Sequence, residues 1–322
     1  MKLKLAWIFL ASALTAGLVV ADEHSDDKER VRVMSWNISK DSFVTDPAAF
    51  QAVLRKAEAD ILLLDEVEPR ADIDKLRNVL AGLQAGPQVA WNIDYGKSGG
   101  RQRGVIASRM ALEPLPEFSS VVPYPEADRR HILNRMSADH RSRTSWSMDD
   151  GIPINGAIVL HGKRRLLAVV ADLQCCGDEP GSWEEFRRRV EMREVRRLVR
   201  QVLKRTQVDG IIVAGDFNLV NTAFPLAILA GPYDHPHAGL IPAELYHLDG
   251  RTTWTWDGRG TPYPSRVLDF QLYGPQALEF YTGYILDSED LSPQELKQAD
   301  LQHKTSTTLS DHRPLVAEYI WR

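Results

Sequence analysis

Four segments of this chain share one layout, in which an apolar stretch ends and polar or acidic side chains follow at once. This repeated layout constrains the fold more than any other feature, because short apolar runs of this kind are typical of buried strands. The polar ends are Asn37, Asp65 with Glu66, Asp216 with Asn218, and Asp311 with His312. Loops at strand ends are where rigid scaffolds usually hold reactive groups, so the layout predicts a site supplied by several strands.

The strand pattern favours two sheets over a regular alternation of strands and helices. Residues 31–38 alternate apolar and polar side chains, whereas 61–64 form a continuous apolar run suited to a fully buried strand. Further short strands are predicted at 104–108, 157–160, 166–172, 210–214, 268–272 and 315–320. With only a few amphipathic helices among roughly ten strands, the sequence predicts two mixed sheets packed face to face with helices outside.

Two helices can be placed from their capping residues. Asp46 is suited to the N-cap and Pro47 to the first position of one helix, which lies between the first two strands. The clearest helix spans about 183–204, where Ser182 and Glu185 match a capping box and one apolar stripe follows.

The second of these helices carries seven arginines between positions 187 and 200. Such a face could bind nucleic acid. Glu184 and Glu185, however, stand four residues before Arg188 and Arg189, as in ordinary helix ion pairs. This pattern favours a solvated helix face.

The chain divides into a leader, a tether and one domain. Residues 1–21 have a basic start, an apolar run and small residues at their end, as secretory signal peptides do. The apolar run of about 16 residues is shorter than the roughly 20 that span a membrane, which favours cleavage over an uncleaved anchor. Residues 22–30 are expected to form a flexible tether, and 31–322 a single domain. We therefore expect an exported protein, periplasmic or secreted, without stable membrane insertion after cleavage and without an evident obligate protein partner.

Charge and cysteine content narrow the function further. Loss of residues 1–21 removes two lysines and no acid, so the net charge falls from −5 to −7. This negative net charge argues against a protein that contacts many phosphates of a long polyanion. It favours a small substrate, or one bound through a few local contacts. The two cysteines, Cys175 and Cys176, are adjacent and cannot staple distant segments, so stability must come from the hydrophobic core.

The residue types at the strand ends are those of acid, base and cation chemistry. Glu66 follows a buried run, where an unpaired charge costs several kcal/mol and needs a cation or metal, unless the strand simply emerges into solvent. Gly215 lets a ligand approach the backbone closely beside Asp216. His312 titrates near neutral pH and stands beside a carboxylate, and Asp269 offers a further acid.

Two motifs carry a resemblance to a known family. They are Gly-Asp-Phe-Asn at 215–218, directly after a strand, and Ser-Asp-His-x-Pro at 310–314. With Asn37, Glu66 and Asp269 in the same order, the chain resembles the endonuclease/exonuclease/phosphatase superfamily over about 31–319. This superfamily of metal-dependent phosphoesterases includes pancreatic-type deoxyribonuclease and neutral sphingomyelinases. The resemblance implies an α+β fold, a four-layer sandwich of two mixed, mainly antiparallel β-sheets with helices on both outer sides.

The resemblance also implies a metal site. A divalent cation, Mg²⁺ or Mn²⁺, would be held chiefly by Glu66, and Asn37 and Asp311 would complete or support that site. A hard cation with oxygen ligands suits phosphate ester hydrolysis, because negative charge spreads over the phosphate oxygens in the transition state.

The same resemblance implies roles for four catalytic residues. His312, oriented by Asp269, would contact the phosphate or assist proton transfer. Asp216 would position and deprotonate the attacking water, and Asn218 would hold a phosphate oxygen. A base on one side of the phosphorus and a charged donor on the other agree with the chemistry of ester hydrolysis.

The chain departs from the family pattern at one position. Many members carry Thr-His-Leu where this chain reads Ala171-Asp172-Leu173. An ionised Asp172 would repel a phosphate unless it bound a second metal or a cationic group of the substrate. The cysteine pair follows directly, and we expect two free or metal-accessible thiols, rather than a strained vicinal disulfide, on a loop that borders the active site.

The sequence thus predicts an exported metal-dependent phosphoesterase that hydrolyses a phosphodiester. Nucleic acid is the leading substrate, because basic stretches at 97–103, 129–143 and along the arginine-rich helix could offset the acidic average locally. A phospholipid, sphingomyelin-like or sugar- or inositol-phosphate ester is the alternative, favoured by the net charge and by nearby aromatic residues. Trp254, Trp256 and Tyr263 could form a stacking platform or belong to the core. A non-catalytic binding module on the same fold is the third reading, motivated by Asp172.

Overall fold

The computed structural model describes residues 29–39, 42–68, 73–83, 90–233 and 239–322. The predicted signal peptide at 1–21 and most of the predicted tether at 22–30 lie outside these residues and stay predictions. The tether is wrong at its last residue, because Arg30 is the first residue of a strand. Its backbone pairs with Ile320, and its guanidinium Nη1 lies 3.0 Å from Glu318 Oε1.

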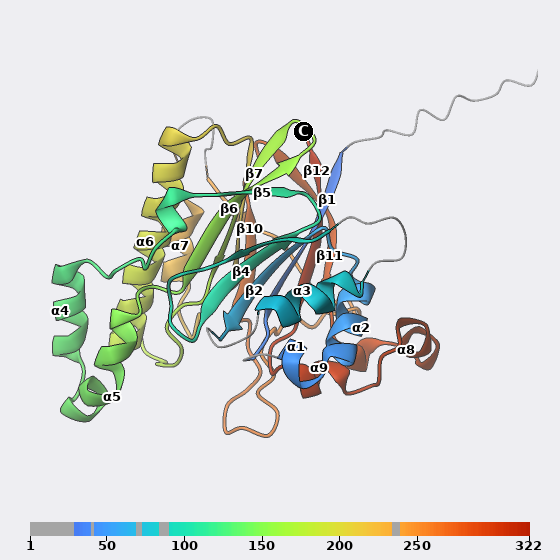
Figure 1. The fold of residues 1–322 in the computed structure, drawn as a ribbon. Coiled ribbons are helices and arrows are strands. Elements are labelled where there is room, and N and C mark those ends of the chain that lie inside the picture. The colour runs from blue at the N-terminus through green and yellow to red at the C-terminus, as the bar shows by residue number, and fades with distance from the viewer. Residues whose placement is uncertain (1–28, 40–41, 69–72, 84–89, 234–238) are drawn as a thin grey trace, which may run out of the picture.

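The described residues form two six-stranded sheets. The first sheet has the spatial order β11 (Leu278–Ile285), β12 (Leu315–Trp321), β1 (Arg30–Asn37), β2 (Ile61–Val67), β4 (Arg103–Ser108) and β3 (Asn92–Tyr95). The second has the order β5 (Ala111–Pro114), β6 (Ile154–His161), β7 (Arg164–Ala171), β8 (Gly210–Asp216), β10 (Asp269–Tyr273) and β9 (Ile241–Pro242). Figure 1 shows the two sheets stacked face to face at the centre of the molecule.

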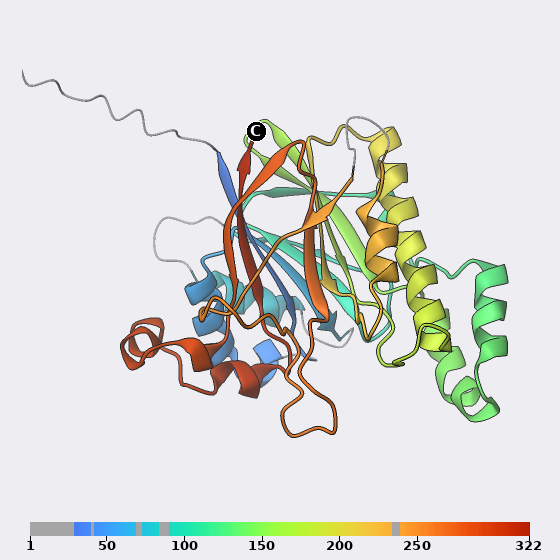
Figure 2. The ribbon, with the colours of Figure 1, turned by 180° about the vertical axis from the view of Figure 1, so that it is seen from behind.

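Helices cover both outer faces (Figures 1 and 2). The first sheet is covered by α1 (Ser42–Thr45), α2 (Pro47–Ala57), α3 (Ile73–Ala81), α8 (Pro293–Ala299) and α9 (Thr305–Leu309), with the 3-10 helix η2 (Ser288–Asp290) nearby. The second is covered by α6 (Trp183–Arg205) and α7 (Phe224–Ala230), with the 3-10 helix η1 (Pro116–Phe118), while α4 (Glu126–Arg135) and α5 (Ala138–Asp149) lie outside α6. The predicted four-layer α+β sandwich is therefore confirmed. No helix among the described residues has the length and apolar character needed to cross a bilayer.

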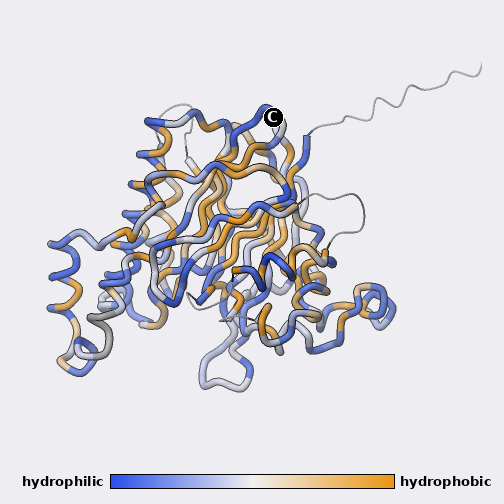
Figure 3. The backbone as a smooth tube through the Cα atoms, viewed as in Figure 1, coloured by the Kyte–Doolittle hydropathy of each residue, from blue (hydrophilic) through white to orange (hydrophobic). Residues whose placement is uncertain are grey.

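The alternation of side chains along the strands builds three cores. Ile61 and Leu63 of β2 point into the core between the sheets, whereas Leu62 and Leu64 point under the helices. The continuous apolar run arises because this strand is buried on both faces. Figure 3 shows the same division along the tube, with hydrophobic strands inside and helices that are hydrophobic on one side only.

The α6 helix follows its predicted bounds but uses its polar residues differently. Ser182 Oγ accepts from Glu185 N at 3.1 Å, as predicted, but the Glu185 carboxylate accepts from Arg188 and Arg189. The capping box is therefore only half formed. The solvated-face prediction is wrong for two arginines, because Arg187 and Arg188 are buried in ion pairs with acids of the same helix.

The topology brings the predicted polar ends to one edge. Each sheet contains one parallel pair, β1 with β2 and β7 with β8, and its other neighbours are antiparallel. The carboxyl ends of the parallel pairs lie at the lower edge in Figure 1. Strands β10 and β12 run the opposite way, so they begin at this edge and bring Asp269 and His312 with them.

A bulge in β2 sets the position of Glu66. Between Leu64 and Val67 the β2 strand has one residue more than its partner β4 between Val105 and Arg103. Glu66 has a φ of 55°, in the left-handed region that a residue with a side chain rarely adopts. Such strain is tolerated mainly where the surrounding structure needs the side chain in one place.

Candidate active site

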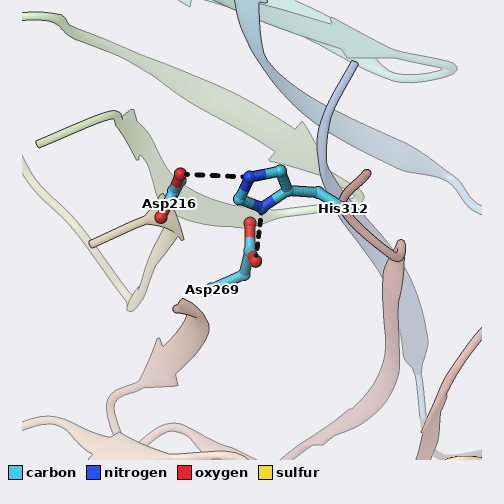
Figure 4. Close-up of side chains that lie close together, drawn as sticks. All are labelled: Asp216, Asp269 and His312. Atoms are coloured by element: carbon cyan, nitrogen blue, oxygen red, sulfur yellow. Dashed lines mark hydrogen bonds and ion pairs between the residues drawn. The ribbon is translucent and has the colours of Figure 1, made fainter. Parts of the chain in front are cut away.

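The centre of the site is a histidine between two carboxylates (Figure 4). His312 Nδ1 lies 2.8 Å from Asp269 Oδ2, and His312 Nε2 lies 3.6 Å from Asp216 Oδ2. All three side chains are buried. Asp216 and Asp269 are opposite one another in the β8–β10 ladder, which fixes the distance between their backbones.

Burial and the neighbouring negative charges shift the pKa of His312 in opposite directions. Burial alone would lower its pKa, but the negative charges of Asp269 and Asp216 outweigh burial and raise it to about 10. The ring is therefore a cation at neutral pH, with both nitrogens protonated. Burial raises the pKa of Asp216 to about 7, although the positive charge of His312 lowers it in part. This value suits a carboxylate that accepts a proton near neutral pH.

Thr255 completes this chain of contacts, and it is not among the site residues predicted from the sequence. Its hydroxyl donates to Asp269 Oδ2 at 2.6 Å and accepts from the backbone N–H groups of Leu268 and Asp269, each at 2.9 Å. Asp269 is thus held by a buried donor on one side and by His312 on the other. A threonine in a loop has no sequence signal that would reveal this contact.

Asn37 connects the two sheets. Its Nδ2 lies 3.3 Å from both Glu66 Oε1 and Asp216 Oδ2, so one amide donates toward a carboxylate of each sheet. Its Oδ1 accepts from Ser39 N at 3.1 Å, which fixes the orientation of the amide. The structure therefore brings Asn37, Glu66, Asp216, Asp269 and His312 together as the sequence predicted.

Asp65 makes a second bond between the sheets. It is fully buried, and its Oδ2 accepts from the backbone N–H of Asp216 at 2.8 Å. Its Oδ1 has no hydrogen-bond partner among the described residues. Burial, followed by the charges of Asp269 and Asp216, raises the pKa of Asp65 well above its usual value. Asp65 follows the apolar run of β2, but no motif in the sequence indicates a role for it.

Asn218 lies beside Asp216 and is fixed by local bonds. Its backbone N–H donates to Asp216 Oδ1 at 2.9 Å, and its Nδ2 donates to Leu173 O at 2.8 Å. Its φ of 51° is in the left-handed region, so the turn after β8 holds this amide in a conformation that few residues adopt. A role in holding a phosphate oxygen stays a prediction.

Asp311 lies at the rim of the site. It is exposed, and its two oxygens accept from Ser39 Oγ at 2.7 Å and from Trp256 Nε1 at 2.9 Å. Its predicted support of the metal stays a prediction. Its contacts instead join the Ser39 turn to the loop before β10.

The predicted aromatic platform is divided between two roles. Trp254 packs beneath two guanidinium groups, with Arg313 Cζ 5.0 Å and Arg259 Cζ 5.7 Å from its ring centre. Trp254 therefore packs against the inner side of the loop before β10 and is not part of an open stacking surface. Tyr263 is 66 % exposed and remains available at the surface.

Asp172 occupies the position where many family members have histidine. It is 1 % exposed, and neither of its carboxylate oxygens has a hydrogen-bond partner among the described residues. Burial, followed by the charges of Glu66, Asp216 and Asp65, raises its pKa well above the usual value. Glu66 and Asp65 belong to one sheet and Asp216 to the other, so negative charges of both sheets act on this carboxyl.

The cysteine loop borders this acid cluster. Cys175 and Cys176 are free thiols in exposed positions, with their sulfurs 2.8 Å apart. The hydrogen bond with Cys176, then burial, then nearby negative charges that include Asp172 and Asp216 raise the pKa of Cys175. Arg188 holds the loop, since its Nη1 donates to Gln174 O at 2.9 Å.

The donors at this edge fit a hard divalent cation. They are carboxylate and amide oxygens, which Mg²⁺ prefers as ligands. Asp172 and Asp65 also present buried oxygens that lack a protein partner among the described residues. Asp216 and Asp269 lie in one group with His312 whose side-chain oxygen and nitrogen atoms are within 4.8 Å of one another, and in this group the two carboxylates, rather than the protonated ring, offer ligand atoms. Glu66, the predicted main ligand, is only half-buried and can be reached from outside.

Two stacked mixed sheets with an acidic, histidine-containing site at one edge define the class of two-sheet sandwich phosphoesterases. The family model described as Endonuclease/Exonuclease/phosphatase matches residues 34–312. The chain therefore belongs to the endonuclease/exonuclease/phosphatase family. No curated protein sequence matches it.

Solved structures share the fold at low sequence identity. TDP2 from D. rerio, in complex with a single strand DNA product, is 15 % identical with a TM-score of 0.51 and matches 90 % of this chain and 98 % of its own. An endonuclease/exonuclease/phosphatase from Bacteroides vulgatus is 15 % identical with a TM-score of 0.56, and the match covers 92 % of this chain and 100 % of that protein. The human Nocturnin catalytic domain with a bound sulfate anion is 16 % identical with a TM-score of 0.54, and the match covers 91 % of this chain and 94 % of that domain.

Proposed function

We propose that this chain is an exported, divalent-metal-dependent phosphoesterase that hydrolyses a phosphodiester, with nucleic acid as its leading substrate. The family assignment supports the reaction class. The observation that carries the proposal is His312, which lies between Asp269 and Asp216, with Asp216 joined through Asn37 to Glu66. The apolar leader at 1–21 supports export.

Each residue has a role that follows from its contacts. Mg²⁺ or Mn²⁺, when bound by Glu66 with support from Asn37 and Asp311, would stabilise the negative charge on the phosphate oxygens. His312, held as a cation by its two acids, is suited to donate a hydrogen bond from Nε2 to the phosphate or leaving oxygen. Asp216 is suited to accept a proton from water, and Asn218 to donate to a phosphate oxygen.

Two features favour nucleic acid as the substrate. A solved relative of the same fold, TDP2 from D. rerio, holds a single strand DNA product. In this chain, Lys97 and Arg101 are exposed on the loop before β4. That strand begins at Arg103 opposite Val67, so the loop lies at the same edge as Glu66. Positive charge at this edge would attract the phosphates that flank a scissile bond.

A phospholipid or sugar-phosphate ester is the second candidate. Tyr263 and Val267 are exposed apolar side chains that precede Asp269 along the chain. A groove lined by Leu245, Val267 and Asp269 runs along the neighbouring surface. An apolar surface beside the site would suit a substrate with an apolar portion.

The test is one screen under one metal condition. The purified chain is assayed on single-stranded DNA, RNA, sphingomyelin vesicles and inositol phosphates, with Mg²⁺ or Mn²⁺ and with EDTA. We expect cleavage of nucleic acid that EDTA abolishes, and a loss of at least about a hundredfold in Glu66→Gln and His312→Gln. Glu279→Gln, an exposed acid on β11 away from the site, is the matched control and should keep full activity.

Three results would contradict the proposal in different ways. Full activity in EDTA would exclude the metal-dependent mechanism. Hydrolysis of a lipid or inositol phosphate without hydrolysis of nucleic acid would replace the leading substrate by the second candidate. If His312→Gln left every measured activity unchanged, the chain would be a binding module rather than an enzyme.

A further inference from the structure

The adjacent thiols of Cys175 and Cys176 are two nucleophilic side chains that the proposed hydrolysis does not use. Both residues are exposed, and their sulfurs lie 2.8 Å apart. The loop that carries them begins beside the site, because Leu173 N donates to Asp216 O and Leu173 O accepts from Asn218 Nδ2, each at 2.8 Å. A group attached to either thiol would therefore sit on a loop that is bonded to the turn after β8.

Two buried charged side chains of α6 hold the backbone of this loop. Arg188, which is fully buried, donates from Nη1 to Gln174 O at 2.9 Å and to Cys176 O at 2.5 Å. Its Nη2 donates to Gly177 O at 3.4 Å. Glu191, also fully buried, accepts from Gln174 N at 2.7 Å. Cys176 itself has a φ of 68°, in the left-handed region. The loop conformation is thus set by α6, and both thiols stay at the surface.

The contact between the two sulfurs makes the thiols unequal. The hydrogen bond from Cys175 lowers the pKa of Cys176 to about 7, with the positive charge of Arg188 acting in the same direction and burial and the charge of Glu184 acting against it. The same hydrogen bond, together with burial, raises the pKa of Cys175. At neutral pH about half of Cys176 is therefore thiolate, whereas Cys175 stays protonated. A thiol with a pKa near the ambient pH is the best nucleophile toward disulfides.

We propose that Cys176 is a site of reversible modification by low-molecular-weight disulfides, with the Cys175 thiol as the hydrogen-bond donor beside it. The Cys176 sulfur attacks one sulfur of the disulfide, the sulfur–sulfur bond of the reagent breaks, and its other half leaves as a thiolate that takes up the proton lost by Cys176. Cys176 is thereby oxidised to a mixed disulfide, and the leaving half of the reagent is reduced to a thiol. The reaction needs no metal and no hydrolysis, so it does not rest on the proposed function. Export would place the chain where disulfides persist.

The reaction should stop at the mixed disulfide. In a further step Cys175 would have to lose its proton, attack the Cys176 sulfur and expel the attached group, which would close an eight-membered ring. Adjacent cysteines can close that ring only with strain, because their geometry departs from that of an ordinary disulfide. The bonds from Arg188 and Glu191 also oppose the backbone shift that ring closure requires. The adduct on Cys176 should therefore persist until another thiol removes it.

The experiment treats the full chain with oxidised glutathione at pH 7 and follows the adduct by intact mass and peptide mapping. We expect one glutathione per chain, on Cys176, formed at least about tenfold faster than at Cys175, with one free thiol left and full release by dithiothreitol. In urea, which removes the loop contacts, the two cysteines should react at similar rates. If the preference for Cys176 were unchanged in urea, it would not arise from the fold, and the inference would be wrong.

Substitutions of Cys175 test the hydrogen bond between the sulfurs. Cys175→Ala removes the donor and should slow the reaction at Cys176 about fivefold at pH 6, because less of the thiol is ionised. Cys175→Ser keeps a donor and is the matched control, which should react at nearly the wild-type rate. An adduct mainly on Cys175, loss of both thiols without an adduct, or equal rates for the wild type and Cys175→Ala would overturn the inference. None of these measurements involves hydrolysis, so a failure of the proposed function would leave them unchanged.

Discussion

At the scale of single residues, the site depends on one carboxylate oxygen that accepts two hydrogen bonds. Asp269 Oδ2 accepts from Thr255 Oγ1 at 2.6 Å and faces His312 Nδ1 at 2.8 Å. Because the threonine hydroxyl also accepts from two backbone amides, its proton has one direction in which to point. Thr255 therefore positions Asp269, and through it the imidazole, without touching the substrate.

Replacing Thr255 by valine tests this positioning role. Thr255→Val keeps the side-chain shape but leaves Asp269 Oδ2 without its second donor, a change worth about 1–2 kcal/mol. We expect kcat to fall about tenfold, with KM and Mn²⁺ binding unchanged. Thr255→Ser keeps the hydroxyl and should recover most of the rate. Equal rates for the valine and serine variants would show that the hydrogen bond has no part in catalysis.

The sequence revealed the residues of this site that belong to motifs and missed those that act through them. Asp216, Asn218 and His312 stand in short specific motifs, and the order of the weaker matches placed Asn37 and Glu66. Thr255 and Asp65 lie in no motif, and their contacts with Asp269 and with Asp216 N depend on how the sheets pack. Contacts between residues remote in sequence leave no periodic signal.

At the scale of elements, a buried arginine fixes the segment that carries His312. Arg313 is fully buried between two acids, with Nη2 2.7 Å from Asp257 Oδ2 and Nε 2.6 Å from Asp287 Oδ2. Its backbone N–H donates to Thr255 O at 2.7 Å. The loop before β10 and the turn before β12 are thus joined directly behind the imidazole.

This network predicts a pH dependence of stability. Burial alone would raise the pKa of Asp257, but hydrogen bonds from Arg259 and the charge of Arg313 outweigh burial and lower it to about 2. The folded pKa lies below the unfolded value of about 3.9, so this acid stabilises the fold above about pH 4 and loses that effect as pH falls toward 2.

The measurement is urea unfolding of the wild type and Asp257→Asn between pH 6 and pH 3. We expect the wild type to lose about 1 kcal/mol more than the variant over this range. At pH 6 the variant should be the less stable of the two, because it leaves part of the charge of buried Arg313 unmatched. Parallel stability curves for the two proteins would show that Asp257 does not titrate with unfolding.

Among the elements, the sequence predicted the central strands and missed the edges. Strands β2 and β8 are buried on both faces and have continuous apolar runs. The four residues of strand β3 are exposed or half-buried, and only the first and last residues of β11 are buried. An edge strand is stabilised by backbone bonds to one neighbour, so its side chains need not follow an apolar pattern.

At the scale of the whole molecule, the two sheets repeat the same arrangement of strands. Each sheet places a parallel pair near its centre, and the two pairs end at the same edge with polar side chains. The bonds from Asn37 and Asp65 to Asp216 join the two halves there. The sequence indicated strands and polar ends separately, but only the relative orientation of the sheets shows that these ends meet.

The structure also shows which of the basic stretches lie near the site, a distinction that the sequence did not provide. Arg193 and Arg197 on α6 pair with Asp128 at 3.0 Å and with Glu194 at 2.6 Å. The helix continues from these residues to Arg205, and the chain then enters β8 at Gly210, the end of that strand opposite Asp216. This helix face therefore extends away from the site edge. Lys97 and Arg101 are exposed on the loop that precedes β4 at the site edge. We therefore expect a nucleic-acid substrate to contact the β3–β4 loop and not the arginine-rich helix.

A paired set of charge substitutions tests this expectation. Lys97→Gln with Arg101→Gln should lower kcat/KM for single-stranded DNA about tenfold at low salt. The dependence of log kcat/KM on log salt should become less steep by about 1.4, because two phosphate contacts are lost at about 0.7 each. Hydrolysis of bis(4-nitrophenyl) phosphate, which has no flanking phosphates, should stay unchanged. Arg193→Gln with Arg197→Gln removes the same charge from α6 and should leave both activities and the salt dependence as in the wild type. If the α6 variant instead loses DNA cleavage and the loop variant keeps it, the polyanion follows the helix, and the placement of the substrate at the β3–β4 loop is wrong.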